Sequence, residues 1–327
     1  MLFELKNTTA SAIDKKLNQV LEDSGNTTTS RVLTLVILAE QGHSKLAVEA
    51  AQQASHEHPS RIIVHIAHEA DAEDRLDAEI SVGGEAGASE VIILRGYGKA
   101  SRATESLISA LLLPDSPIVA WWPHSVPENA SEHSIGKIAQ RRITDSARAQ
   151  DPMMVLRQLA KTYTAGDTDL AWIRLTLWRI QLAAVLDQLP AAKVKRVSVA
   201  GSSKSPSVVL LGAWLGYKLG AGVHLTTKGA DRGLYRVALE REDGKVMLYR
   251  PGRSIATLTS PIGPDQQISL PVRSLAECLA EELRRLDPDK VYGEVLTQAI
   301  PAVEMVVDMN AAEVIDEVED FTEEYDA

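Results

Sequence analysis

The chain has 327 residues, of which 45% are hydrophobic and 24% are charged, and its formal net charge is −11 at pH 7. This length exceeds what one hydrophobic core comfortably supports, so we expect two domains. The acidic excess is concentrated near the C-terminus, because no lysine or arginine follows Lys290. Nucleic-acid binding requires a basic surface, and a membrane helix requires about 20 consecutive apolar residues. The sequence has neither, so we expect no nucleic-acid and no membrane partner.

The N-terminus and the cysteine content indicate a compartment. The first 17 residues have no basic segment followed by an apolar core, which a secretory signal requires. A single cysteine, Cys278, cannot form an internal disulfide and suits a reducing cytosol. We therefore expect a cytoplasmic protein in which Cys278 lies on a helix and packs in the core.

The first half of the chain alternates apolar, strand-like runs with helical segments. Strands are expected at residues 31–40, 61–68, 76–84, 89–96, 116–123 and 141–146. Helices are expected at residues 9–22, 44–56, 102–114 and 151–164. The β-branched run 31–40, RVLTLVILAE, is typical of a strand covered on both faces. The alternation predicts an N-terminal α/β domain over residues 1–167, with a mostly parallel sheet and crossover helices.

Residues 169–190, DLAWIRLTLWRIQLAAVLDQLP, form the longest apolar run. On a helical wheel, apolar residues fill two flanks that two polar stripes separate. We therefore expect a helix packed between two bodies, with Asp169 as its N-cap and Pro190 at its end. Trp178 follows Arg174 by four residues, a spacing that permits a cation–π contact.

The second half of the chain begins as another α/β unit and then changes character. A strand from residue 193 leads through a Gly/Ser turn into a helix at 206–220. Short alternating segments follow, which predict an antiparallel meander at residues 222–229, 233–243, 245–252, 254–260 and 266–272. A helix at 274–287 and another after Pro288 are expected to close this domain. We expect a C-terminal α/β domain at 168–302, entered through helix 169–190, and an acidic tail at 303–327 that is either disordered or a helix folding on a partner.

One loop has features of an anion site. Gly201, Ser202, Ser203, Lys204 and Ser205 follow a strand and open a helix. Backbone N–H groups and hydroxyls at a helix N-terminus can hold a phosphate, to which Lys204 would add positive charge. The spacing matches neither the Walker A loop nor the dinucleotide fingerprint. An ordinary capped turn is the alternative interpretation.

A second group of residues has features of a protein interface. Trp121 and Trp122 are adjacent on a predicted strand and therefore point to opposite faces, so one can fill the core while the other contacts a partner. The nearby stretch 141–146, RRITDS, combines charge with hydroxyls, although an internal Arg–Asp pair would explain it equally well. The predicted partner-contact residues are Trp121, Trp122, Arg141, Arg142, Trp172 and Arg174.

Other candidate sites lack the context that chemistry requires. His56, His58, His65 and His68 have HxH and HxxH spacings, but no cysteine accompanies them and alternate strand positions face opposite ways. The glycine-rich turn at 84–87 precedes a strand, whereas a nucleotide loop follows one. Catalytic motifs such as GxSxG, HExxH and CxxC are absent. The sequence therefore predicts no metal, no cofactor and no catalytic residues.

Several segments, in their order and spacing, carry a resemblance to a known family. They are HPSR (58–61), GEAGASEVIIL (84–94), LLLPDSPIVAWWP (111–123), RRITDS (141–146), DLAWIRLTLWR (169–179) and LLGAWLGYKLG (210–220). Over nearly its whole length, the chain resembles the OpcA family of glucose-6-phosphate dehydrogenase assembly proteins, most closely the actinobacterial type. The dehydrogenase itself has a GxxGDLA loop and an RIDHYLGK-type catalytic stretch, and this chain has neither.

The resemblance implies a function that composition and spacing do not supply. It implies a cytosolic, non-catalytic partner of glucose-6-phosphate dehydrogenase that promotes assembly or activity in the oxidative pentose phosphate pathway. The family has no catalytic residues to carry over to this sequence. The alternative hypothesis, which rests on residues 201–205, is a sensor that binds a sugar phosphate or a nucleotide. A third is an enzyme of unrecognised type.

Overall fold

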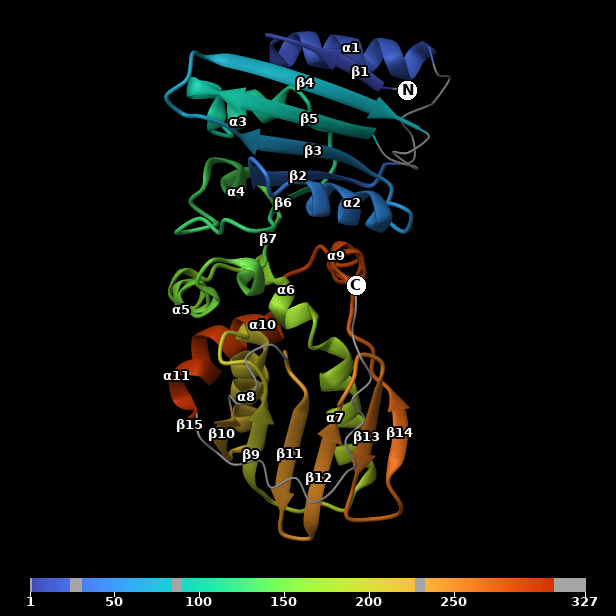
Figure 1. Cartoon of the computed structure of the whole chain (residues 1–327), viewed down its shortest axis with the longest axis vertical. Coiled ribbons are helices and arrows are strands. Elements are labelled where there is room, and N and C mark those ends of the chain that lie inside the picture. Colours follow the sequence, from blue (N-terminus) through green and yellow to red (C-terminus); the bar gives the residue numbers. More distant parts are fainter. Residues whose placement is uncertain (1, 24–30, 84–89, 227–232, 309–327) are drawn as a thin grey trace.

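The computed structural model describes residues 2–23, 31–83, 90–226 and 233–308. Two β-sheets lie one after the other along the long axis of the molecule, and helices occupy the layer between them (Figure 1). Both sheets are mixed and both carry helices, so the predicted two-domain α/β class is confirmed. The glycine-rich turn at 84–87 lies outside the described residues, as does the predicted tail from residue 309 onward.

The N-terminal sheet has eight strands in the order β1-β4-β5-β3-β2-β6-β7-β8. Their bounds are β1 (Leu2–Leu5), β2 (Leu33–Glu40), β3 (Ser60–Ala67), β4 (Arg75–Val82), β5 (Glu90–Tyr97), β6 (Ile118–Trp122), β7 (Arg141–Thr144) and β8 (Asp167–Asp169). The six strands from β5 to β8 in this order are parallel, whereas β4 and β1 add an antiparallel edge. The sequence did not predict β1 and β8, which are too short to show a periodicity.

Helices cover both faces of this sheet. They are α1 (Ala10–Asp23), α2 (Lys45–Ala54), α3 (Glu105–Ser109), α4 (Ser134–Ile138) and α5 (Pro152–Thr162), with 3-10 turns η3 (Gly98–Ser101) and η4 (Ser146–Arg148). Residues of α1, α3 and α4 form one core cluster with the outer face of the sheet, and residues of α2 and α5 belong to a second cluster with the inner face. The helix predicted at 102–114 is confined to α3, which Thr104 caps.

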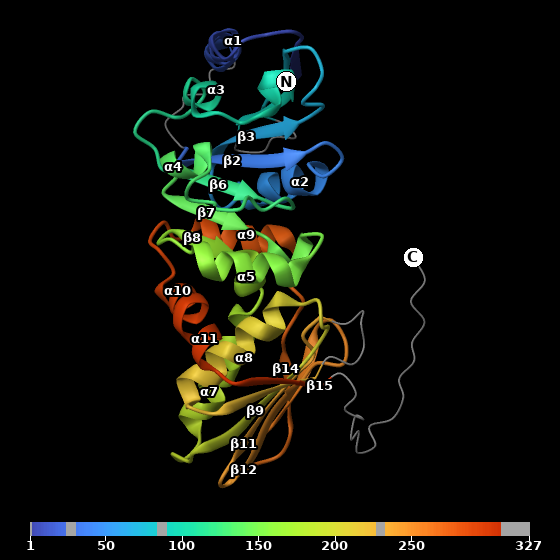
Figure 2. The ribbon, with the colours of Figure 1, turned by 90° about the vertical axis from the view of Figure 1, so that its left-hand side faces the viewer.

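The C-terminal sheet has seven strands in the order β14-β13-β12-β11-β9-β10-β15. Their bounds are β9 (Val194–Ala200), β10 (Gly222–Thr226), β11 (Arg236–Arg241), β12 (Gly244–Tyr249), β13 (Ile255–Thr259), β14 (Gln266–Ser269) and β15 (Met305–Asp308). The predicted antiparallel meander is confirmed from β11 to β14. The prediction is wrong for its first segment, because β10 pairs in parallel with β9. Residues 305–308, which the sequence assigned to a tail, instead form a strand that pairs in parallel with β10. Helix α8 (Pro206–Leu219) packs on β9 and β10, and Figure 2 shows α7 (Thr176–Gln188) and α8 on the same side of the sheet.

The segment predicted as one helix at 169–190 is two helices, α6 (Leu170–Ile173) and α7 (Thr176–Gln188). At the break, the Leu175 N–H donates to the Trp172 carbonyl in a tight turn, and the Ile173 carbonyl accepts from Arg273. All four residues of α6 are buried, so α6 does lie between two parts of the molecule, as the sequence predicted for the whole segment. In contrast, α7 buries one face, and Ile180 on its other side is 54% exposed.

The last helices are α9 (Leu275–Leu283), α10 (Lys290–Glu294) and α11 (Ile300–Ala302), with a π-helical turn, η5 (Val295–Ala299), before α11. The sequence placed the first of these in the C-terminal domain. This helix, α9, packs against α2 beneath the N-terminal sheet (Figure 1), and Arg284 forms an ion pair with Glu57 at 2.9 Å. One continuous hydrophobic core therefore runs from the inner face of the first sheet, through α6 and α9, into the second sheet.

Candidate functional site

Asp169 joins the end of the N-terminal sheet to the start of α6. Its carboxylate is fully buried and accepts four hydrogen bonds, from the Thr144 hydroxyl, the Ser146 hydroxyl and N–H, and the Ala171 N–H, at 2.6–2.8 Å. The last of these bonds caps α6, as the sequence predicted. Thr144 and Ser146 belong to the RRITDS stretch, so two of its six residues hold this carboxylate.

Asp145, also from RRITDS, pairs with Arg174 at the break between α6 and α7. The pair is bidentate, and both N–O distances are 2.7 Å. Asp145 is completely buried, whereas the Arg174 side chain is 25% exposed. Burial raises the pKa of Asp145, and the Arg174 guanidinium opposes that rise. This is the internal Arg–Asp pair that the sequence left as an alternative to a contact surface.

The two arginines that open β7 also have internal partners. The Arg141 guanidinium forms an ion pair with Glu282 of α9, and both side chains are buried. This pair connects the two halves of the chain. Arg142 forms an ion pair with Asp167 and donates to the carbonyls of Ala139 (3.1 Å) and Ala165 (2.7 Å). Burial lowers the pKa of Arg141.

The tryptophans of the predicted interface are buried within the chain. Trp121 and Trp122 do point to opposite faces of the sheet, and each belongs to a different core cluster. Trp122 is only 3% exposed because His133 covers it in an edge-to-face contact at 5.3 Å between ring centroids. Trp172 is fully buried, and its indole N–H donates to Asp289 at 2.8 Å. Of the six predicted partner-contact residues, only Arg174 reaches the surface. The other five are buried within the chain, and their contact with a partner stays a prediction.

The predicted phosphate loop divides between the core and the surface. Gly201 and Ser202 are buried, and Ser203 and Lys204 are exposed. Gly201 is required for packing, because a Cβ atom there would lie 2.5 Å from a methyl carbon of Val208. Ser205 is the N-cap residue of α8, and its side chain makes no capping hydrogen bond.

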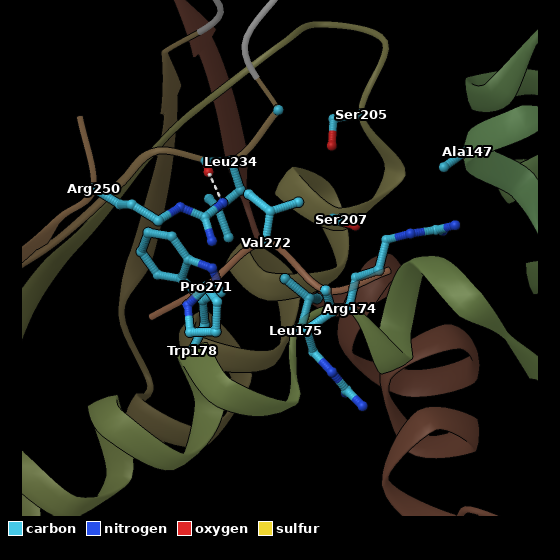
Figure 3. A pocket seen from close by; sticks show the side chains of 12 residues that line it. Ala147, Arg174, Leu175, Trp178, Ser205, Ser207, Leu234, Arg250, Pro271 and Val272 are labelled. Carbon is cyan, nitrogen blue, oxygen red and sulfur yellow. Dashed lines mark hydrogen bonds between the residues drawn. The ribbon is translucent and has the colours of Figure 1, made fainter. Parts of the chain in front are cut away.

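Ser205 and Arg174 line the same cavity, which has a volume of about 280 Å³. The cavity lies among η4, the α6–α7 break, the start of α8 and the loops before β11, after β12 and before α9 (Figure 3). Its lining residues are Ala147, Arg174, Leu175, Trp178, Ser205, Ser207, Gly233, Leu234, Arg250, Pro271, Val272 and Arg273. The cavity thus brings together Ser205 of the predicted phosphate loop and Arg174 of the predicted partner-contact residues.

Two cation–π contacts at this junction differ from the predicted one. Arg174 is occupied by Asp145, and Arg250 instead lies over the Trp178 ring at 5.1 Å. Arg179 lies over Trp172 at 3.8 Å. Sequence spacing missed Arg250 because it is 72 positions from Trp178 along the chain and comes from another element. No local pattern relates the two residues.

The histidines do not converge on a metal site. His65 is buried and its Nε2 lies 2.9 Å from the Ala100 carbonyl oxygen, whereas His68 stacks on Tyr97. Within the described ranges, no three His, Cys, Asp or Glu side chains are grouped so as to hold a metal ion. Among the helices of the same ranges, none has both the length and the apolar character to cross a membrane.

Two family models cover most of the chain. Residues 51–161 match the N-terminal domain of the glucose-6-phosphate dehydrogenase subunit, and residues 165–296 match its C-terminal domain. The chain belongs to the OpcA family of glucose-6-phosphate dehydrogenase assembly proteins. The division between the two models, at residues 161–165, falls just before β8 and α6. Among curated proteins, no sequence matches this OpcA-family chain.

Two solved structures show a distant similarity to the chain. One is KijD10, a 3-ketoreductase from Actinomadura kijaniata in complex with TDP-benzene and NADP. It is 8% identical, has a TM-score of 0.45, and the match covers 84% of this chain and 99% of that one. Another is an NAD-binding oxidoreductase from Klebsiella pneumoniae, 9% identical, with a TM-score of 0.44 and coverage of 84% and 96%. At these values, the matches say nothing about the activity of the OpcA-family chain.

Proposed function

We propose that the chain is a non-catalytic, cytoplasmic subunit of glucose-6-phosphate dehydrogenase, which it binds and holds in an assembled, active state in the oxidative pentose phosphate pathway. The observation that carries this proposal is the match of both halves of the chain to the two domains of the dehydrogenase subunit family. The family match supports an association with the dehydrogenase. We add to it the proposals that the chain is not catalytic and that it acts by holding the dehydrogenase in its active state.

The chemistry of the junction supports a structural role for its charged residues. A catalytic carboxylate or arginine needs access to a substrate. Asp169 uses its oxygens on four internal donors, and Asp145 uses both of its oxygens on Arg174. Arg141 and Arg142 are likewise paired inside the chain. The Arg141–Glu282 and Arg174–Asp145 pairs therefore hold α9 and the α6–α7 break against the N-terminal sheet.

A subunit of this kind works by binding one state of its target more tightly than another. A tenfold preference corresponds to about 1.4 kcal/mol of coupling free energy. A binding surface built from both sheets keeps that preference only if the sheets keep their relative positions. The predicted interface residues Trp121, Trp172 and Arg141 would then affect the dehydrogenase indirectly, through the junction that they stabilise.

We propose that direct contact involves a groove between α7 and the β13–β14 hairpin. The groove has a volume of about 200 Å³ and is lined by Gln181 and Gln188 of α7 and by Ile262 of the hairpin loop. Ile262 is 58% exposed. An exposed apolar side chain beside a polar-rimmed depression is typical of a protein contact site.

The test is to purify the chain and the dehydrogenase of the same organism and to mix them over a range of ratios. We expect co-elution from a sizing column and a higher rate of NADP reduction from glucose 6-phosphate. The chain alone should give no NADP reduction with this substrate. Unchanged kinetics and separate elution at every ratio would rule out the subunit.

The contact groove is tested with a matched pair of variants. Ile262→Asp should weaken co-elution, because it places a charge in an apolar contact, and it should leave the melting temperature nearly unchanged since the side chain is exposed. Ile255→Asp, which changes another isoleucine that is 58% exposed, is the control. Equal effects of both substitutions would show that the groove has no special part in binding.

A further inference from the structure

We propose that the cavity lined by Arg250, Trp178 and Ser205 binds a small phosphorylated metabolite of about the size of a sugar monophosphate. This goes beyond the proposed function, because ligand binding is a property of the chain alone and does not depend on the dehydrogenase.

The first argument is the position of the cavity in the fold. Ser205 lies in the loop that leaves the carboxyl end of β9, and Ala147 lies just beyond the carboxyl end of β7. In open α/β sheets, ligands bind outside the carboxyl ends of the strands, and pockets occur preferentially between domains. Here the carboxyl ends of strands from both sheets border one cavity.

The second argument is charge. Among the described residues that line the cavity, three are arginines and none is aspartate or glutamate. The guanidinium groups of Arg174 and Arg273 are neutralised by Asp145 and Glu281. Within the described part of the chain, the Arg250 guanidinium forms no ion pair and donates only to the backbone carbonyls of Leu234 and Leu270, each at 3.1 Å.

The position of Arg250 leaves its positive charge available to a ligand. Its guanidinium lies between the Trp178 ring and the Leu234 carbonyl at one side of the cavity (Figure 3). An arginine held by neutral partners retains its full charge and can bind an anion without breaking an ion pair. The N-terminal end of α8, a 14-residue helix, adds a favourable dipole at the opposite side.

The third argument is size and the rest of the lining. Pockets for drug-sized ligands measure about 300–1,000 Å³, so a cavity of about 280 Å³ suits a smaller molecule and excludes a dinucleotide. The Ser205 hydroxyl points into the cavity in Figure 3 and makes no capping bond. Leu175, Trp178 and Val272 supply apolar walls for a carbon skeleton. An anionic head group with a small organic body fits this combination.

The experiment uses the full chain without the dehydrogenase. Calorimetric titrations with glucose 6-phosphate and glycerol 3-phosphate are compared with titrations of inorganic phosphate and of glucose. We expect the phosphate esters to bind, inorganic phosphate to bind at least about tenfold more weakly, and glucose not to bind. Binding should also change the tryptophan fluorescence, and Trp178→Phe should remove that change.

Two variants assign the binding to this cavity. Arg250→Gln removes the charge, and Ser205→Asp places a carboxylate where the anion would lie. Aspartate is as good an N-cap as serine, so the second variant keeps α8 intact. Each should weaken binding at least about tenfold, whereas Arg196→Gln, at an exposed arginine near the other end of β9, should not.

Three results would overturn the assignment. They are the absence of binding by either phosphate ester, equal affinity for inorganic phosphate and the esters, and wild-type affinity in Ser205→Asp. None of them bears on co-elution with the dehydrogenase, so this inference and the proposed function fail separately.

Discussion

Replacing Arg174 with methionine removes the partner of a completely buried carboxylate. In the native chain, both oxygens of Asp145 accept from Arg174 at 2.7 Å. Methionine has a similar length and can follow the apolar part of the arginine side chain. The substitution therefore isolates the loss of charge and hydrogen bonding at the break between α6 and α7.

Removing one member of a buried ion pair costs about 3–5 kcal/mol, because the other charge stays buried and uncompensated. The lower end of that range applies here, because the Arg174 side chain is 25% exposed and water partly screens the pair. The double variant Arg174→Met/Asp145→Asn removes both charges of this pair. We expect it to recover part of the loss, so the two substitutions should be non-additive.

The assay is equilibrium unfolding in urea, with the free energy of unfolding compared at pH 5 and pH 7.5. Burial already raises the pKa of Asp145, and loss of Arg174 should raise it further. A carboxyl group whose pKa is higher in the folded state takes up protons on folding, so its contribution to stability improves as pH falls towards that pKa. The deficit of Arg174→Met relative to wild type should therefore be smaller at pH 5.

The reasoning would be refuted by a loss of less than about 1 kcal/mol, which is typical of a surface pair. It would equally be refuted by a double variant less stable than the single one, or by a deficit that grows on acidification.

Three further predictions concern other parts of the fold. Burial lowers the pKa of His65 below 6.5, so the unfolded state binds more protons than the folded state below pH 6.5. The free energy of unfolding should therefore fall on acidification by up to about 1.4 kcal/mol per pH unit. His65→Gln should reduce this pH dependence in urea titrations. Burial raises the pKa of Cys278 to about 11, so a thiol reagent at pH 8 should label it only as fast as the chain opens, and immediate labelling would contradict the burial. Gly201→Ala should cost about 1–3 kcal/mol in thermal unfolding, because its Cβ would lie 2.5 Å from Val208, whereas Gly252→Ala, with open space around it, should cost far less.

The elements with strong local patterns could be predicted from the sequence. The β-branched run 31–40 and the apolar helix 206–220 became β2 and α8, and Asp169 became the predicted N-cap. The opposite orientations of Trp121 and Trp122 followed from strand alternation alone. These features depend on residues that are close in sequence.

What could not be predicted depends on contacts between distant segments. The alternating pattern of a buried strand is the same whether the covering layer is another part of the chain or a partner, so Trp122 could not be placed inside. The amphipathic pattern of residues 275–283 marks an apolar face but does not say that α2 is its neighbour. In the same way, the cavity needs Arg250 and Trp178 from elements that no local rule connects.

The path of α9 has a consequence for how the protein folds during synthesis. The ribosome synthesises the N-terminal sheet first, yet α9, which packs on α2, follows α2 by more than 200 residues. Until residues 275–283 leave the ribosome, the side of α2 that packs against α9 has no permanent cover. Contacts of such long sequence separation slow folding and leave intermediates prone to aggregation. The N-terminal half expressed alone should therefore be poorly soluble, and adding residues 275–283 in trans or by fusion should improve its recovery.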